Sequence, residues 1–555
     1  MISIFIDYKL TRFQHEIKHA LNFIFQTLGY GYCYIADTGQ LKDNDILLIY
    51  GYTEPTSEEL KSIARRYITI FIQSDPNLFD PKGFSLEKLR SSLKVIKLLS
   101  PTPVISARQF QHPAENFSDS SIHAGKINFD IVGNVFFHLA SLEPLIDGNR
   151  TPEGWFNESA SLFAAHRDTP YVDNLLWLLD SMIKEHTRAK GVYITQKHYW
   201  PQAQQAAATL SHSVDSLQKW NYSSLLLSFG TDLLLLFSLN FRALLHDLAG
   251  KFRYLFTNYE LYWNFEEFRN MEQDSGCLST FFLATDKDDY INYSLDDPDL
   301  QEEIRHLTHA GHDAGLLLSP AKPNRDDFIA QKQIMLHQLH REQLGIRQLN
   351  YQLNEALLDL HQTLAPSYSQ STARPGEPGY PRGISVPYQP WIAGLKASFW
   401  ELPTVLYDGQ LRLGRFKFLQ LDAAKHLVKK SLQNTLRSRG VFGVDFSLAS
   451  YADIRYCHKL YAYILALVKA NKTWVTTARE LVLWWEKRGR VTIEEGEFEI
   501  SVYFPDDLPH FCLQLYNDAR IKEIDGVPAR IEDNLIRFSN IKAGSIAVLR
   551  LNKDE

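Results

Sequence analysis

The first residues of the chain, M-I-S-I-F-I-D (residues 1–7), open the stretch that determines its class of fold. Their apolar, β-rich run predicts a strand, and an amphipathic helical period follows over residues 13–28. Further β-rich runs and a second helical period cover residues 33–36, 46–50, 57–65 and 67–73. This alternation predicts a small α/β domain with a parallel sheet, which we assign to residues 1–125.

A short glycine-rich segment lies within this stretch. Gly29-Tyr30-Gly31-Tyr32 lacks the spacing of a dinucleotide-binding or Walker loop. Because Gly29 directly follows the helical period, we expect it to end that helix.

Length and composition define a multidomain globular protein. The 555 residues are too many for one hydrophobic core, and 45% apolar with 22% charged residues is typical of globular chains. Lys and Arg total 58 against 65 for Asp and Glu, a net charge of -7. No basic domain is present to hold a phosphate backbone, so we expect no nucleic-acid partner.

The cysteines and the N-terminal residues bear on the cellular compartment of the protein. The 4 cysteines are scattered and form no CxxC pair, which argues against a disulfide scaffold and a zinc ribbon. The first residues lack the basic start and the apolar stretch of a signal peptide. We therefore expect a cytoplasmic protein.

Residues 223–241 (SSLLLSFGTDLLLLFSLNF) form a strongly apolar segment. A membrane-spanning helix needs about 20 apolar residues with few charges, whereas Asp232 lies mid-segment and Gly230 interrupts it. We expect a buried or partner-facing helix and no integral membrane segment. Basic residues follow at once, so peripheral membrane contact stays open as an alternative; they are Arg242, Lys251 and Arg253, with His246 among them.

The rest of the chain divides into two parts. Long helical periods and buried apolar strands fill residues 126–489. From residue 490 to 555 apolar and polar residues alternate in short runs, which predicts a small antiparallel β-domain.

The central part resembles the polysaccharide deacetylases, which are NodB-homology carbohydrate esterases, in the long three-domain bacterial form. The matching segments, in chain order, are NFDIVGNVFFHL (128–139), TPYVD (169–173), LSHSVDSLQKW (210–220), STFF (279–282), GHDAGL (311–316), RQ (347–348), the loop 379–388 and WVTTARE (474–480). The resemblance implies a central distorted (β/α) barrel of NodB-homology type, whose functional face lies at the carboxyl ends of its strands.

The resemblance also implies a metal centre. In the family a divalent metal, held by one Asp and two His, polarises an N-acetyl carbonyl and activates a water, while another Asp and His act as base and acid. Here the corresponding positions hold Ser213, Leu317, Leu349 and Ser447. Leucine cannot ligate a metal and serine is a poor ligand, so we expect a degenerate site with no metal cofactor.

These losses lead to the first functional hypothesis. The protein is a pseudoenzyme that has lost metal-dependent catalysis and binds a glycan or a protein partner in bacterial surface-polysaccharide metabolism. Asp215, His212, Arg347 and Asp408 are candidate remnants of the site, although a capping Asp, a turn-forming Asp and a buried ion pair are equally ordinary roles for such residues.

Two alternatives stay open. The first is an active sugar N- or O-deacetylase, hydrolysing a C–N or ester bond at a site rebuilt around Asp215 and His212, with His309 or His312. Two groups of histidines have the spacing of one helix face, namely those at 306, 309 and 312 and those at 337 and 340. A relocated metal site on such a face is a further hypothesis. The second alternative is an assembly or membrane-associated scaffold that docks through residues 223–241.

Overall fold

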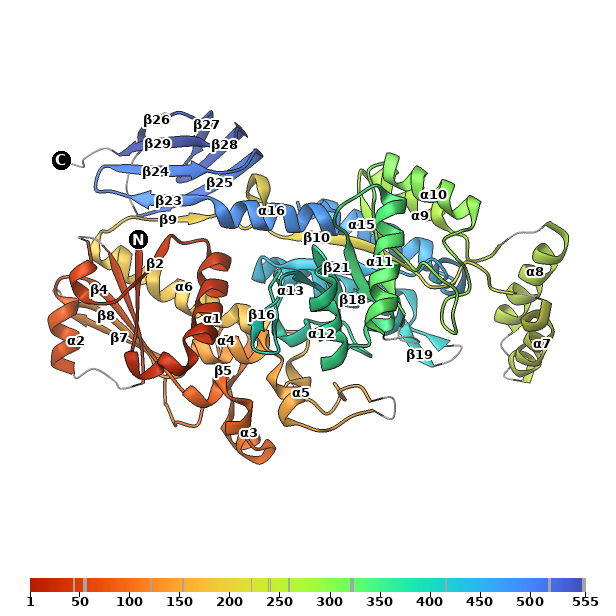
Figure 1. Cartoon of the computed structure of the whole chain (residues 1–555), viewed down its shortest axis with the longest axis horizontal. Coiled ribbons are helices and arrows are strands. Elements are labelled where there is room, and N and C mark those ends of the chain that lie inside the picture. The colour runs from red at the N-terminus through yellow and green to blue at the C-terminus, as the bar shows by residue number, and fades with distance from the viewer. Residues whose placement is uncertain are drawn as a thin grey trace.

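The computed structural model describes residues 1–42, 45–52, 57–119, 122–151, 154–220, 222–237, 239, 241–257, 260–319, 324–414, 417–517 and 521–551. An N-terminal sheet, a central barrel and a C-terminal pair of sheets lie side by side, and a helical hairpin projects from the barrel (Figure 1).

The N-terminal sheet has six strands in the order β2-β1-β3-β4-β8-β7. All neighbours are parallel except β7 and β8, as the sequence predicts for an α/β domain. Strands β3 and β4 are buried at every position because helices cover both faces. The bounds are β1 Ile2–Ile6, β2 Tyr32–Ile35, β3 Ile46–Gly51, β4 Ile68–Gln73, β7 Ala114–Asp119, β8 Ile122–Ile127, α1 Gln14–Leu28 and α2 Ser57–Ala64.

Helix α1 ends where its glycine predicts. Gly29 has φ 83° and caps the helix, and its amide donates to the carbonyl of Phe25. A side chain at this position would lie 2.6 Å from the carbonyl oxygen of Lys197 and 2.7 Å from the Arg488 guanidinium. Glycine is therefore required here both for its backbone conformation and for close packing.

The barrel is built from parallel strands in the order β17-β14-β13-β12-β11-β10-β21-β18, with β22 beside β10. Strand β17 lies against β21, which nearly closes the ring, so the expected distorted (β/α) barrel is confirmed. The strands are β10 Ala207–Val214, β11 Ser279–Leu283, β12 Asp313–Leu318, β13 Gly345–Gln348, β14 Tyr368–Ala373, β17 Trp400–Thr404, β18 Leu406–Tyr407, β21 Val441–Asp445 and β22 Trp474–Thr476.

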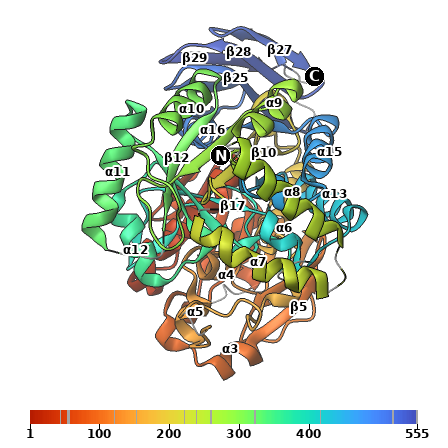
Figure 2. The ribbon, with the colours of Figure 1, turned by 90° about the vertical axis from the view of Figure 1, so that its right-hand side faces the viewer.

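Helices surround the barrel (Figure 2). They are α9 Phe265–Ser275, α10 Pro298–His309, α11 Arg325–Leu339, α12 Glu355–Leu364, α13 Leu421–Ser438, α15 Cys457–Ala470 and α16 Ala478–Arg490.

The C-terminal domain consists of two four-stranded antiparallel sheets, β23-β24-β29-β26 and β27-β28-β25-β9. Rings of Phe504, Phe511 and Phe538 contact one another between the sheets. The bounds are β9 Ile194–Lys197, β23 Thr492–Glu495, β24 Glu499–Phe504, β25 Leu508–Tyr516, β26 Ile521–Asp525, β27 Ala529–Glu532, β28 Leu535–Ile541 and β29 Ser545–Leu551. The expected antiparallel domain is present, and its edge strand β9 comes from the segment that precedes the barrel.

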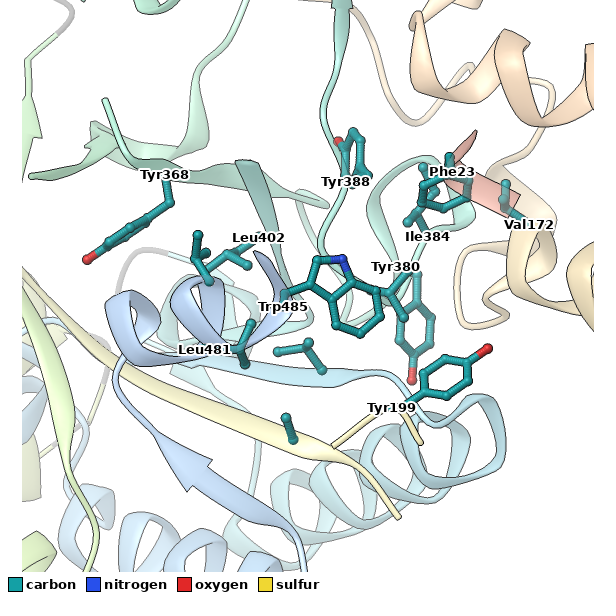
Figure 3. Packing of buried hydrophobic residues seen from close by; sticks show 14 of the residues in the cluster. Phe23, Val172, Tyr199, Tyr368, Tyr380, Ile384, Tyr388, Leu402, Leu481 and Trp485 are labelled. Atoms are coloured by element: carbon teal, nitrogen blue, oxygen red, sulfur yellow. The ribbon is translucent and has the colours of Figure 1, made fainter. Parts of the chain in front are cut away.

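The three parts share one continuous core. Figure 3 shows Trp485 of α16 and Tyr199 beside Tyr380 and Ile384 of a barrel loop, with Phe23 of α1 nearby. Helices α4 (Ile131–Leu139) and α6 (Tyr171–Lys190) pack near the N-terminal sheet although they follow residue 125. The boundaries at 125 and 489 stay predictions.

Buried Arg488 joins these parts through backbone carbonyls. Its guanidinium donates to the carbonyl oxygens of Gln26 and Thr27 in α1, and to those of Lys197 and His198 at the end of β9. The distances are 2.6–3.2 Å.

The apolar segment 223–241 is not a buried helix, and the partner-facing alternative stays a prediction. Helix α7 (Tyr222–Phe237) ends within the segment, and α8 (Phe241–Thr257) begins at its last residue. Gly230 does not interrupt α7, and large side chains of the segment, such as Phe237 and Leu239, are exposed. Among the described residues, no helix is long and apolar enough to cross a membrane.

Candidate functional site

The centre of the barrel holds a buried arginine and aspartate. Alternate side chains of a strand point to the same face, so Ser211 and Ser213 of β10, Arg347 of β13 and Asp445 of β21 all point inward. The Arg347 guanidinium lies 2.5 Å from Asp445 Oδ1 and donates to Ser211 Oγ at 2.7 Å. Its plane also packs 4.2 Å from the ring centre of Phe282.

Both oxygens of the Asp445 carboxylate accept hydrogen bonds. Oδ1 accepts from Arg347, and Ser211 Oγ lies 3.3 Å from it. The single hydroxyl hydrogen of Ser211 is shared with the carbonyl oxygen of Val444, which lies 2.9 Å away. Oδ2 accepts from Ser213 Oγ at 2.9 Å and from the Tyr351 hydroxyl at 2.8 Å. Protein donors therefore occupy both oxygens of Asp445.

This centre does not fit a divalent metal. The family position Ser213 donates to Asp445, and Leu317 is the register neighbour of Arg347 on β12. The guanidinium occupies the middle of the ring and would repel a cation. In the described part of the chain, no three His, Cys, Asp or Glu side chains are grouped as metal ligands.

Within the residues that the structure describes, the remaining two altered positions make no hydrogen bond to the ion pair. Leu349 is buried directly after β13. Ser447 follows β21 and contacts Asp408, donating from its amide at 3.0 Å and from its hydroxyl at 2.6 Å to Oδ2. Asp408 is therefore held by Ser447, with which the sequence had not paired it.

Asp215 and Asp408 form a second acidic feature at the carboxyl end of the barrel. Asp215 Oδ1 is buried and has no hydrogen-bond partner. Burial, with the neighbouring charges of Asp408 and Asp445, raises the pKa of Asp215 to about 7. Burial also raises the pKa of Asp408, against the hydrogen bonds from Ser447. Asp215 can therefore exchange a proton near neutral pH.

His212 lies on the opposite side of β10 from Asp215. Its Nε2 lies 2.9 Å from Glu272 Oε1 and its Nδ1 lies 2.8 Å from the carbonyl oxygen of Phe446. Glu272 also accepts from Tyr461 and lies 3.6 Å from His312. This fully buried network joins β10 to α9 and α15, so neither histidine is placed beside Asp215.

The other histidines with helical spacing do not extend that network. His306 is 55% exposed and lies 3.8 Å from Glu302 on its own helix. His337 and His340 contact each other at the end of α11.

A cavity of about 680 Å³ lies between the barrel and the segment 137–161. Its volume is in the range of small-ligand sites, about 300–1,000 Å³. Aromatic side chains line it, namely Trp155, Phe156, Tyr171, Tyr351, Trp391 and Tyr407. Charged side chains complete the wall, among them Glu143, Glu158, Glu355, Arg374 and Arg382.

Two lining groups have unused donors. Trp155 Nε1 is buried without a partner, and so is Arg374 Nη2, which lies 3.8 Å from Glu158. Tyr351 connects the cavity to the barrel centre, because its ring lies 5.0 Å from that of Tyr407 and its hydroxyl bonds Asp445.

Sequence reasoning did not find this cavity, Asp445 or Tyr351. The walls of the cavity come from segments that are far apart in the chain, and no local sequence pattern shows that these segments meet. One sequence feature could have identified Asp445, because it is a single carboxylate at the end of a buried strand.

Comparisons by sequence gave no matching protein-family model and no matching curated protein. Solved structures similar to this chain include the carbohydrate deacetylase Agd3, at 9% identity and a TM-score of 0.37 over 100% of this chain and 98% of that one. A putative polysaccharide deacetylase from Mycobacterium smegmatis aligns at 14% identity and a TM-score of 0.35, covering 54% of this chain and 96% of its own.

A further similar structure is a putative polysaccharide deacetylase involved in O-antigen biosynthesis from Bordetella bronchiseptica. It aligns at 13% identity and a TM-score of 0.24, over 49% of this chain and 93% of its own. At such scores the likeness transfers no residue role, and the class of fold rests on the strand topology. The resemblance to polysaccharide deacetylases is thus one of fold.

Proposed function

We propose that this polysaccharide-deacetylase-like chain has lost metal-dependent catalysis and binds a glycan in bacterial surface-polysaccharide metabolism. The observation that carries the proposal is the Asp445 carboxylate, both of whose oxygens have protein donors, with the Arg347 guanidinium in the middle of the barrel. A cation entering there would have to displace a buried ion pair and the hydrogen bonds from Ser213 and Tyr351, and it would meet positive charge.

The cavity supports glycan binding. Sugar rings present apolar faces that pack on aromatic rings and hydroxyls that pair with charged side chains. Tyr351, Tyr407 and Trp391 supply such rings, while Trp155 Nε1 and Arg374 Nη2 are donors without a hydrogen-bond partner, although Arg374 Nη2 pairs loosely with Glu158 at 3.8 Å. Burying an unpaired donor is unfavourable, so a ligand hydroxyl or carbonyl would satisfy these groups.

Metal analysis tests the first half of the proposal. The protein is dialysed against zinc, cobalt or nickel and its bound metal is measured. We expect no stoichiometric binding, and Arg347→Ala is the variant most able to create some. Tight stoichiometric binding by the unaltered protein that is lost in Asp445→Asn would contradict the proposal.

Calorimetric titration with acetylated and deacetylated hexosamine oligosaccharides tests the second half. Trp155→Phe keeps the ring and removes the Nε1–H donor, so affinity should fall about tenfold, as for one lost hydrogen bond. Trp177→Phe is the matched control, since Trp177 is exposed and outside the cavity. Equal affinities for the two variants would argue against this cavity as the site.

A second candidate function rests on Asp215. Its raised pKa and free Oδ1 suit a general base, which supports an active sugar N- or O-deacetylase with a rebuilt site. Acetate release from acetylated hexosamine substrates, abolished in Asp215→Asn, would establish that activity. No release over a broad panel would leave the binding role as the better account.

A further inference from the structure

The hairpin of α7 and α8 stands apart from the rest of the molecule. It is inserted between β10 and β11 and projects from the barrel (Figure 1). The two helices pack on each other, and among the described elements neither packs extensively on another helix or strand. Its surface is thus available to something outside the chain.

That surface is apolar. Phe237 at the end of α7 is 80% exposed, and Phe252 on α8 is 64% exposed. The exposed positions of α8 recur every three or four residues, which forms a stripe along the helix. The exposed large apolar residues of the hairpin are Phe229, Leu233, Leu234, Leu236, Phe237, Leu239, Phe241, Leu245, Leu248, Phe252, Leu255 and Phe256.

The charges of the hairpin lie inside it. Lys251 is 3% exposed and pairs with Asp232 across the two helices, and with Asp247 at 2.9 Å. Lys219, just before α7, also lies 2.9 Å from Asp247. Segment 222–257 contains no other acidic residue, so both carboxylates are neutralised by lysines.

Hydroxyl groups within α7 also have hydrogen-bond partners inside the hairpin. Ser228 Oγ donates to the carbonyl oxygen of Leu225, and Thr231 Oγ1 to that of Ser228, both at 2.6 Å. These hydroxyls, Lys251 and one oxygen of Asp232 therefore find partners within the hairpin, while the other Asp232 oxygen, Oδ1, is buried without a hydrogen-bond partner.

The hairpin has its charges inside and its apolar side chains outside, and this indicates which surroundings suit it. In water, charged side chains face outward and apolar ones inward, which is the reverse of what is found. A protein interface pairs polar groups across a rim around its apolar centre. A bilayer offers no hydrogen-bond partners in its acyl region, so a segment entering it must satisfy its polar groups internally and present apolar side chains outward.

The dimensions limit how deep the hairpin can go. Helices of 16 and 17 residues extend about 24–26 Å, less than the hydrocarbon core of about 30 Å. Neither helix can span a membrane, so insertion would stay within one leaflet.

We propose that the α7–α8 hairpin inserts into the interfacial region of a phospholipid membrane and attaches the protein to its surface. The Phe237–Phe241 end enters first, because it joins the two helices and carries the most exposed apolar side chain. Arg242 and Arg253 leave the segment with excess basic charge, which favours anionic headgroups. This role is independent of the proposed glycan site.

Co-sedimentation of the full chain with vesicles tests the proposal. We expect binding to equimolar phosphatidylcholine and phosphatidylglycerol vesicles. The double change Phe237→Ser with Phe252→Ser should weaken partitioning by about a hundredfold, at about tenfold for each large side chain. The control Tyr8→Ser with Leu395→Ser removes two side chains that are 77% and 65% exposed elsewhere, and should bind like the unaltered protein.

A second measurement separates lipid from protein partners. A Phe237→Trp variant should show added fluorescence that brominated phospholipids quench. Sedimentation equilibrium without vesicles should give a mass that Phe237→Ser with Phe252→Ser does not change. Self-association abolished by those changes, without quenching, would overturn the proposal in favour of a second copy of the chain. Failure of the unaltered protein to sediment with vesicles would overturn it outright.

Discussion

The barrel centre and the projecting hairpin both enclose an ion pair, but their surroundings are opposite. Arg347 and Asp445 lie inside a ring of strands, and both side chains are almost fully buried. Lys251, Asp232 and Asp247 are enclosed by only two helices, whose outer faces carry exposed Leu and Phe. In the barrel the pair fills the space enclosed by the strands; in the hairpin it removes charge from an apolar surface.

Breaking the barrel pair should give the largest effect. Arg347→Ala leaves a buried carboxylate with no counter-charge, which should lower the free energy of unfolding by about 3–5 kcal/mol. Chemical denaturation measures it. Arg550→Ala breaks an exposed pair with Glu523 and should cost no more than about 1 kcal/mol. Similar losses in both variants would show that the barrel pair is not strongly desolvated.

The two regions should also differ in their response to pH. The folded-state pKa of Asp215 is about 7, above its ordinary value of 3.8, so the folded protein holds an additional proton between those values. Stability then falls as pH rises through this window, by up to about 4 kcal/mol in total. Asp215→Asn should remove that part of the slope, measured by denaturation at a series of pH values.

Asp247 in the hairpin should behave in the opposite sense. Burial alone would raise its pKa, but Lys251 and Lys219 lower it overall. Its contribution is therefore present above the ordinary pKa of about 4 and is lost only as pH falls through the lower folded value. Asp247→Asn should leave the slope between pH 5 and 8 unchanged; a change like that of Asp215→Asn would contradict this assignment.

Removing the hairpin lysine should act locally. Lys251→Met leaves Asp232 without its lysine and Asp247 with Lys219 alone, and should reduce hydrogen-exchange protection throughout residues 222–257. The unfolding of the barrel should change by less than about 1 kcal/mol, because the helices pack mainly on each other. Protection lost across the barrel strands would show that the two regions are coupled.

A modest effect is expected for the hydroxyl that links the cavity to the barrel. Tyr351→Phe removes the hydroxyl that donates to Asp445 while keeping the ring beside Tyr407, which should cost about 1–2 kcal/mol of stability. Tyr503→Phe, on an exposed strand position, is the control. Unchanged stability in Tyr351→Phe would mean that water replaces the hydroxyl.

Structural features that depend only on residues close together in the chain could be predicted from the sequence. The apolar runs of β1, β3 and β4 and the glycine after α1 act locally, so the α/β class and the helix end at Leu28 could be predicted. The altered position Ser213 could also be located, since it lies on a recognisable strand.

The residues that Ser213 contacts could not be predicted. The meeting of Ser213 with Arg347 and Asp445 depends on the register of strands that are 98–232 residues apart in the chain. Of the two roles expected for segment 223–241, burial was wrong for a related reason: Lys251, which pairs with Asp232, lies beyond the segment. Local pattern could not show that the charge would be inside and the leucines outside.

Arg488 has a consequence for how the protein can be divided. Its guanidinium satisfies carbonyl oxygens from α1 and from the end of β9, while its own helix belongs to the barrel. A fragment that ends before this residue would leave those carbonyls without their donor, and one that begins after it would also lack β9, the edge partner of β25. The three parts are therefore expected to unfold in a single transition and to be poorly soluble when expressed separately.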